Sequence, residues 1–175
     1  MKPLALLLVI ATILLACNKP KPRHNPISKV QIYTGPCFGD CPVQTVSIDS
    51  TLAVNYWGDR NTKYHGFFTA TIPQALWDSV NFKLEQIHYK NLKAFYPETY
   101  TDGPDYYVLI EHGCVKTYID ASVSGLPDNV YHVFTSILNT YKSVKLTPVK
   151  DSIKFDTFKR QRVIDVKSIR FPPKP

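Results

Sequence analysis

The chain has 175 residues, of which 44% are hydrophobic, with four cysteines and a formal net charge of +7 at pH 7. This length suits one domain with flanking tails and excludes several full-sized domains. Residues 17–141 hold ten Lys or Arg against eleven Asp or Glu, whereas residues 142–175 hold ten against three. Because the body is near neutral and the basic residues lie in a C-terminal tail, we expect no nucleic-acid partner.

The first residues predict an export signal. Lys2 precedes an apolar run that ends at Leu15. The run is shorter than the roughly 20 residues that cross a bilayer, and it has the length and small-residue exit of a signal peptide. The exit, LLAC ending at Cys17, resembles the lipobox of bacterial lipoproteins. By that resemblance residues 1–16 form a lipoprotein signal peptide and Cys17 is acylated, for example with palmitate. The alternative is an ordinary signal peptide followed by a chance cysteine.

Residues 17–27 are rich in proline and predict an extended tether between the lipid and the domain. Asn18, not Asp, follows Cys17, which by analogy with bacterial lipoproteins favours the outer membrane over the inner one. We therefore expect a lipid-anchored protein of the bacterial cell envelope. The basic tail, residues 145–175, would meet an envelope protein or an anionic glycan or lipid, or would simply be solvated.

Residues 28–144 are predicted to form an α+β domain. Period-two alternation predicts strands, and apolar residues at helical spacing predict one helix that begins near Pro73 and a second that opens at Pro127. The order strands, helix, hairpin, helix predicts a mainly antiparallel sheet of five to six strands with both helices packed on one face. The tail adds a possible edge strand at residues 163–171. The strands in the body are expected at residues 29–34, 43–49, 52–58, 64–70, 106–112 and 114–120.

The segment GPCFGDCPV, residues 35–43, is the main candidate functional loop. An exported chain meets an oxidising compartment in which disulfides persist. A bond between Cys37 and Cys41 would close a five-residue ring and stabilise the fold by about 2 kcal/mol. Glycine and proline supply the tight path that such a ring needs. The other residues of the candidate loop are Gly35, Pro36, Phe38, Gly39, Asp40 and Pro42.

The same cysteine spacing has a chemical alternative. Cys-x-x-x-Cys-Pro resembles the copper site of the Sco-type copper chaperones, in which two thiolates and a distant histidine hold the metal. By that resemblance Cys37 and Cys41, with His112 and Cys114 as further ligands, would handle copper or thiol redox chemistry. In that family the motif leads into a helix, whereas here it leads into the period-two segment VQTVSID. The context therefore favours the structural disulfide, which leaves Cys114 without a partner.

Two longer segments carry a family resemblance. YTGPCFGDCPVQTVSID and YTDGPDYYVLIEHG resemble an uncharacterised family of bacterial lipoproteins and secreted proteins, catalogued as a domain of unknown function, with the signature G-P-C-F-G-x-C-P. The resemblance spans about residues 28–142, and Gln44 stands where the family typically has tyrosine. It implies a fold and a cellular address, and it implies no activity, cofactor or site residue.

The five histidines lack metal-binding spacing, and no nucleophile elbow or phosphate loop is present. We therefore expect a non-enzymatic protein without a cofactor: a lipid-anchored binding or structural module. The alternative function is thiol-redox or copper handling through the cysteine pair.

Overall fold

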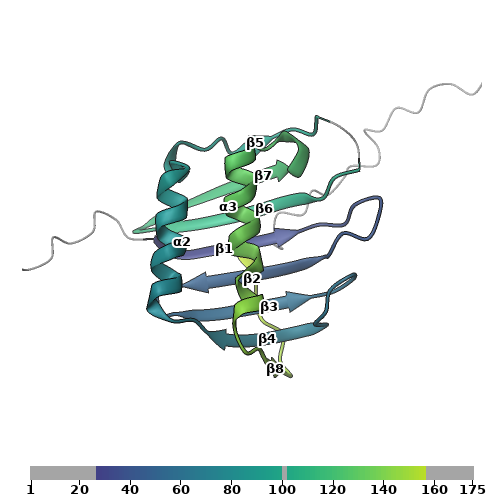
Figure 1. Ribbon diagram of the computed structural model, residues 1–175, viewed down its shortest axis with the longest axis vertical. Helices are drawn as coiled ribbons and strands as arrows, with labels where there is room; N and C mark the ends of the chain where they lie inside the picture. Colours follow the sequence, from purple (N-terminus) through teal and green to yellow (C-terminus); the bar gives the residue numbers. More distant parts are fainter. Residues whose placement is uncertain (1–26, 100–101, 157–175) are drawn as a thin grey trace, which may run out of the picture.

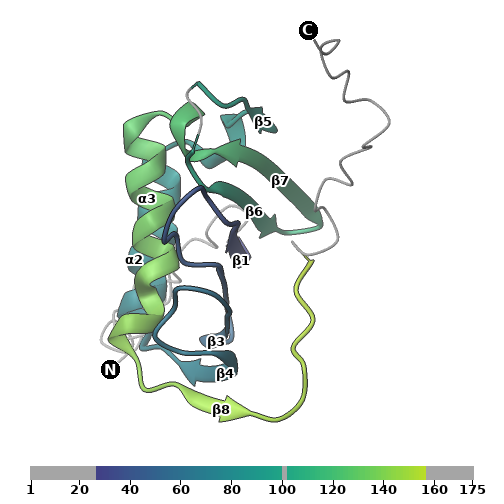
Figure 2. The same ribbon diagram turned by 90° about the vertical axis from the view of Figure 1, so that its right-hand side faces the viewer.

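The structure, a computed structural model, describes residues 27–99 and 102–156. They form one sheet with both helices on the same face (Figures 1 and 2). The predicted signal peptide, the predicted acylation site Cys17, the predicted tether up to residue 26 and the predicted edge strand at residues 163–171 lie outside the described residues.

The sheet has eight strands in the order β5-β7-β6-β1-β2-β3-β4-β8. Neighbouring strands are antiparallel except β5 and β7, which run parallel. The prediction of a mainly antiparallel sheet of five to six strands is therefore wrong, because the sheet is mixed and larger. The strands are β1 (Ile27–Thr34), β2 (Gln44–Asp49), β3 (Ala53–Gly58), β4 (Gly66–Thr71), β5 (Phe95–Tyr96), β6 (Asp105–His112), β7 (Val115–Ser122) and β8 (Thr147–Val149).

The two unpredicted strands are short. β5 has two residues and β8 has three, too few to display the alternation by which a strand is recognised in a sequence. Pro148, at the centre of β8, lacks the N–H group of a ladder donor, which confines it to a sheet edge. β8 indeed lies at the edge, beside β4. Tertiary pairing, and not local sequence pattern, defines both strands.

Helices α2 (Gln74–Gln86) and α3 (Asp128–Leu138) run across the strands (Figure 1). α2 carries the chain from β4 to β5 at the opposite side of the sheet, and α3 carries it back from β7 toward β8. Val80 and Leu84 of α2 and Phe134 of α3 are buried against the sheet, as their helical spacing predicts. The described residues also contain three 3-10 helices: η1 (Tyr89–Asn91), η2 (Val123–Gly125) and η3 (Asn139–Ser143).

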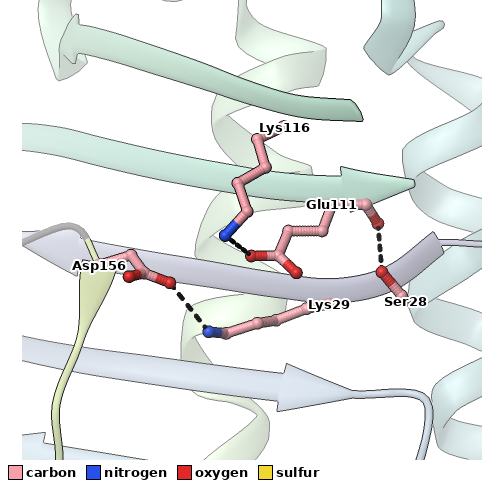
Figure 3. Close-up of polar contacts among 5 residues, drawn as sticks. All are labelled: Ser28, Lys29, Glu111, Lys116 and Asp156. Atoms are coloured by element: carbon pink, nitrogen blue, oxygen red, sulfur yellow. Dashed lines mark hydrogen bonds and ion pairs between the residues drawn. The ribbon is translucent and has the colours of Figure 1, made fainter. Parts of the chain in front are cut away.

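The segment after β8 crosses the sheet face opposite the helices (Figure 2). Phe155 is buried there, and Asp156 Oδ2 lies 3.2 Å from Lys29 Nζ. Beside this pair, Lys116 Nζ lies 2.8 Å from Glu111 Oε1 (Figure 3). The hydrogen bond and the charge of Glu111 raise the pKa of Lys116. Residues 147–156 of the predicted tail are therefore part of the folded unit.

Candidate functional site: the cysteine loop

The cysteine loop, residues 35–43, joins β1 to β2 at one end of the sheet (Figure 1). It is tied to a neighbouring segment on each side. At its start, the Gly35 N–H donates to the Asp105 carbonyl at 2.9 Å, where β6 begins. At its end, the Val43 N–H donates to the Arg60 carbonyl at 2.9 Å, in the turn between β3 and β4. Both ends of the loop are thus held by backbone hydrogen bonds, one to β6 and one to the β3–β4 turn.

The two cysteines of the loop lie at disulfide distance, as predicted. Their Cα atoms are 5.6 Å apart and their sulfurs are bonded, which is within the span of ordinary disulfides. Inside the ring the Gly39 N–H donates to Cys37 Sγ at 3.3 Å. The ring therefore fixes the backbone on both sides of Phe38.

Side chains outside the ring hold its second half in place. Thr34 Oγ1 donates to the Pro42 carbonyl at 2.7 Å, and Asn61 Nδ2 donates to the Cys41 carbonyl at 3.3 Å. Asn61 has a positive φ of 58°, a conformation that asparagine tolerates better than most residues. Sequence reasoning missed the roles of Asn61 and Arg60, because no local pattern links the β3–β4 turn to a loop about twenty residues earlier.

An aromatic cluster forms the floor of this end of the sheet. Tyr56 is fully buried, its hydroxyl donates to Gln44 Oε1 at 3.2 Å, and its ring centroid lies 4.5 Å from that of Tyr141. Burial, and next the neighbouring Tyr141, raise the pKa of Tyr56 to about 12. Gly58 is required beside it, since a Cβ there would lie 2.0 Å from the Tyr64 carbonyl oxygen. Gln44, the first residue after the loop, is therefore held by a close-packed aromatic cluster.

Phe38 stands at the tip of the loop with 89% of its surface exposed. Single exposed apolar side chains are common on proteins, but the backbone that carries Phe38 is fixed by the disulfide and by the flanking hydrogen bonds. Gly39 and Asp40 beside it are also exposed. The other exposed large apolar side chains of the described residues, at 48–63% exposure, are Phe82, Phe95 and Val115.

His112 and Cys114 are not part of this site. In the pairing of β1 with β6, Thr34 lies opposite Tyr106 and Ile27 lies opposite His112. Thr34 and Ile27 are seven residues apart along β1, which corresponds to about 23 Å. The fold thus does not bring the four ligands of the copper alternative together. Among the described residues, no three His, Cys, Asp or Glu side chains are placed to hold a metal ion.

The fold and the loop together describe a domain with one mixed eight-stranded sheet, two helices on one face and a disulfide-closed loop at the end of its central strands. Residues 28–141 match the family described as Domain of unknown function (DUF6438), and the chain belongs to this family. The predicted resemblance to a domain of unknown function is thereby confirmed. β8 and the segment that follows it lie beyond the matched residues. Neither the curated proteins nor the solved structures gave a match.

None of the helices in the described part of the chain is long and apolar enough to cross a membrane.

Proposed function

We propose that this protein is a lipid-anchored component of the bacterial cell envelope, whose domain is a non-catalytic binding module that presents Phe38 to a protein partner. The observation that carries the proposal is the 89% exposure of Phe38 on a loop that is closed by a disulfide and hydrogen-bonded at one end to β6 and at the other to the β3–β4 turn. Aromatic side chains are enriched where proteins bind one another.

The fixed loop favours binding in two ways. Moving a phenylalanine side chain from water into an apolar pocket contributes roughly 1.5–3 kcal/mol. The rigid ring also reduces the conformational entropy that binding costs, because little of the loop needs to be ordered on contact. A protruding ring fits a concave apolar pocket, and such a pocket is the expected complement on the partner protein.

Alanine variants at two exposed phenylalanines test the binding role. Both Phe38, on the cysteine loop, and Phe82, on α2, are mostly exposed, so neither Phe38→Ala nor Phe82→Ala should disturb the fold. For a partner that copurifies with the native protein, we expect Phe38→Ala to weaken binding about tenfold or more and Phe82→Ala to leave it unchanged. Equal effects of the two substitutions on the dissociation constant would refute the proposal.

The proposed membrane anchor rests on the lipobox-like LLAC sequence that ends at Cys17 and on the proline-rich segment after it. We expect Cys17→Ser to abolish incorporation of labelled palmitate in the cell, because the thiol is the site of acylation. Cys114→Ser is the matched control and should retain the label. Full labelling of Cys17→Ser would contradict the anchor and leave the binding test unaffected.

A further inference from the structure

A cavity of about 270 Å³ lies between α2 and α3, away from the cysteine loop. The two helices lie side by side across the sheet (Figure 1). Buried Val80 and Ile137 form the apolar floor of the cavity. Short hydroxylated side chains stand where larger apolar residues would close the space between two packed helices. The polar residues that line the cavity are Ser79, Lys83, Ser136, Asn139, Thr140 and Ser143.

The cavity lining carries one positive charge and no carboxylate. Lys83 Nζ donates to Ser136 Oγ at 2.6 Å, which orients the ammonium group and leaves two of its three N–H donors for a ligand. Ser79, Asn139 and Ser143 make no side-chain hydrogen bond with another described residue. A cation and three uncommitted polar side chains therefore surround the same small space.

The residues that line the cavity indicate the class of ligand that it would bind. No aromatic ring lines the cavity, so the stacking platform that commonly holds a neutral sugar is missing. The volume is below the roughly 300–1,000 Å³ of pockets that hold drug-sized molecules. Ammonium, hydroxyl and amide groups together suit a phosphate oxygen and adjacent alcohol groups.

We infer that this cavity is a binding site for a small phosphorylated polyol, of which glycerol phosphate is the simplest representative. Lys83 binds the phosphate, while Ser79, Asn139 and Ser143 bind the hydroxyl groups. The same chemical unit occurs as a free metabolite and as the headgroup of phosphatidylglycerol. The site is independent of Phe38 and of the proposed protein partner.

The test uses the ¹⁵N-labelled full-length chain in zwitterionic detergent micelles, followed by nuclear magnetic resonance. Glycerol phosphate, glycerol, and micelles doped with phosphatidylglycerol or phosphatidylcholine are the four probes. We expect saturable shifts of the amides of residues 79–83 and 136–143 with glycerol phosphate, with phosphatidylglycerol or with both, and no such shifts with glycerol or phosphatidylcholine. Shifts with both glycerol phosphate and phosphatidylglycerol assign a site open to the free ligand, and shifts with phosphatidylglycerol alone assign the lipid headgroup.

Two lysine substitutions separate a built site from general attraction of anions. Lys83→Gln should weaken binding about tenfold or more, the range expected for losing a hydrogen bond to a charged group. Lys93→Gln removes an exposed lysine that does not line the cavity and should leave binding unchanged. The inference is overturned if neither glycerol phosphate nor phosphatidylglycerol gives saturable shifts, if glycerol or phosphatidylcholine gives the same shifts, or if both lysine variants lose affinity equally.

Discussion

Two threonines near the cysteine loop differ in whether their side-chain hydroxyl group is hydrogen-bonded. Thr34 Oγ1 donates to the Pro42 carbonyl at 2.7 Å. Thr45 is fully buried, and its Oγ1 has no hydrogen-bond partner among the described residues. A buried hydroxyl without a partner costs free energy, whereas a bonded one contributes about 1 kcal/mol. A Thr→Val substitution should therefore change the free energy of unfolding in opposite directions at the two positions.

We expect Thr45→Val to raise the free energy of unfolding by about 1 kcal/mol and Thr34→Val to lower it by a similar amount. Valine keeps the branched shape in both strands, so the hydroxyl is the only group that changes in kind. Urea unfolding followed by circular dichroism measures both values. A loss of stability of equal size at the two positions would show that the Thr45 hydroxyl is bonded after all.

The raised pKa of Tyr56, about 12 against an ordinary 10.0, predicts a loss of stability at alkaline pH. Folding favours the neutral phenol, so its stabilising contribution is complete below pH 10 and is lost as the pH rises through about 12. The free energy of unfolding of the native chain should fall over this window. Burial also raises the pKa of Tyr89, Tyr106 and Tyr141, so other tyrosines share in this fall.

Tyr56→Phe isolates the contribution of one phenol. We expect a shallower fall of the free energy of unfolding between about pH 10 and 12 than in the native chain. At neutral pH the variant should be about 1 kcal/mol less stable, because the hydrogen bond to Gln44 is lost. Urea unfolding across this pH range measures both effects, and identical slopes for the two proteins would contradict the assignment.

At the scale of the element, the cysteine loop combines a short covalent ring with hydrogen bonds to β6 and to the β3–β4 turn. Closing a five-residue ring lowers the conformational entropy of the unfolded chain, which raises its free energy by about 2 kcal/mol. We therefore expect the double variant Cys37→Ser, Cys41→Ser to lose about 2 kcal/mol of stability in urea unfolding. Cys114→Ser, which changes an exposed free thiol, is the control and should lose less than about 0.5 kcal/mol. A double variant as stable as this control would mean that the ring contributes nothing.

The sequence correctly predicted the elements that depend on interactions between residues close together in the chain. The helical spacing of Val80 and Leu84 located α2, and the separation of only four positions between Cys37 and Cys41 was enough to suggest their pairing. β5 and β8 could not be found in this way, because two or three residues form a strand only when a neighbour pairs with them. The fold class was wrong for that reason.

The candidate site shows the same division between local and distant interactions. The cysteine loop could be selected from its own residues, but its support by Arg60 and Asn61 depends on the packing of β2 against β3. The four ligands of the copper alternative are not brought together, because β6 begins beside the cysteine loop and ends at the opposite end of the sheet. His112, at the end of β6, is therefore far from Cys41. Sequence spacing cannot supply such distances, since they depend on strand order and register.

In the complete domain, the sheet separates the surfaces for which different functions are proposed. The helices and the cavity beside Lys83 lie on one face, the segment with Phe155 crosses the other, and the cysteine loop projects from one end of the strands (Figures 1 and 2). A partner bound at Phe38 would therefore leave both faces accessible. This arrangement suits the proposed binding of a partner through the cysteine loop.

The most direct measurement is site-specific photo-cross-linking in intact cells, with a photoreactive phenylalanine analogue placed at position 38 or at position 82. Both sites are exposed phenylalanines, so the analogue should be tolerated equally. We predict one discrete protein adduct from position 38, lost when Cys37 and Cys41 are replaced by serine, and no such adduct from position 82. No adduct from position 38, or the same adducts from both positions, would contradict a binding module that acts through the cysteine loop.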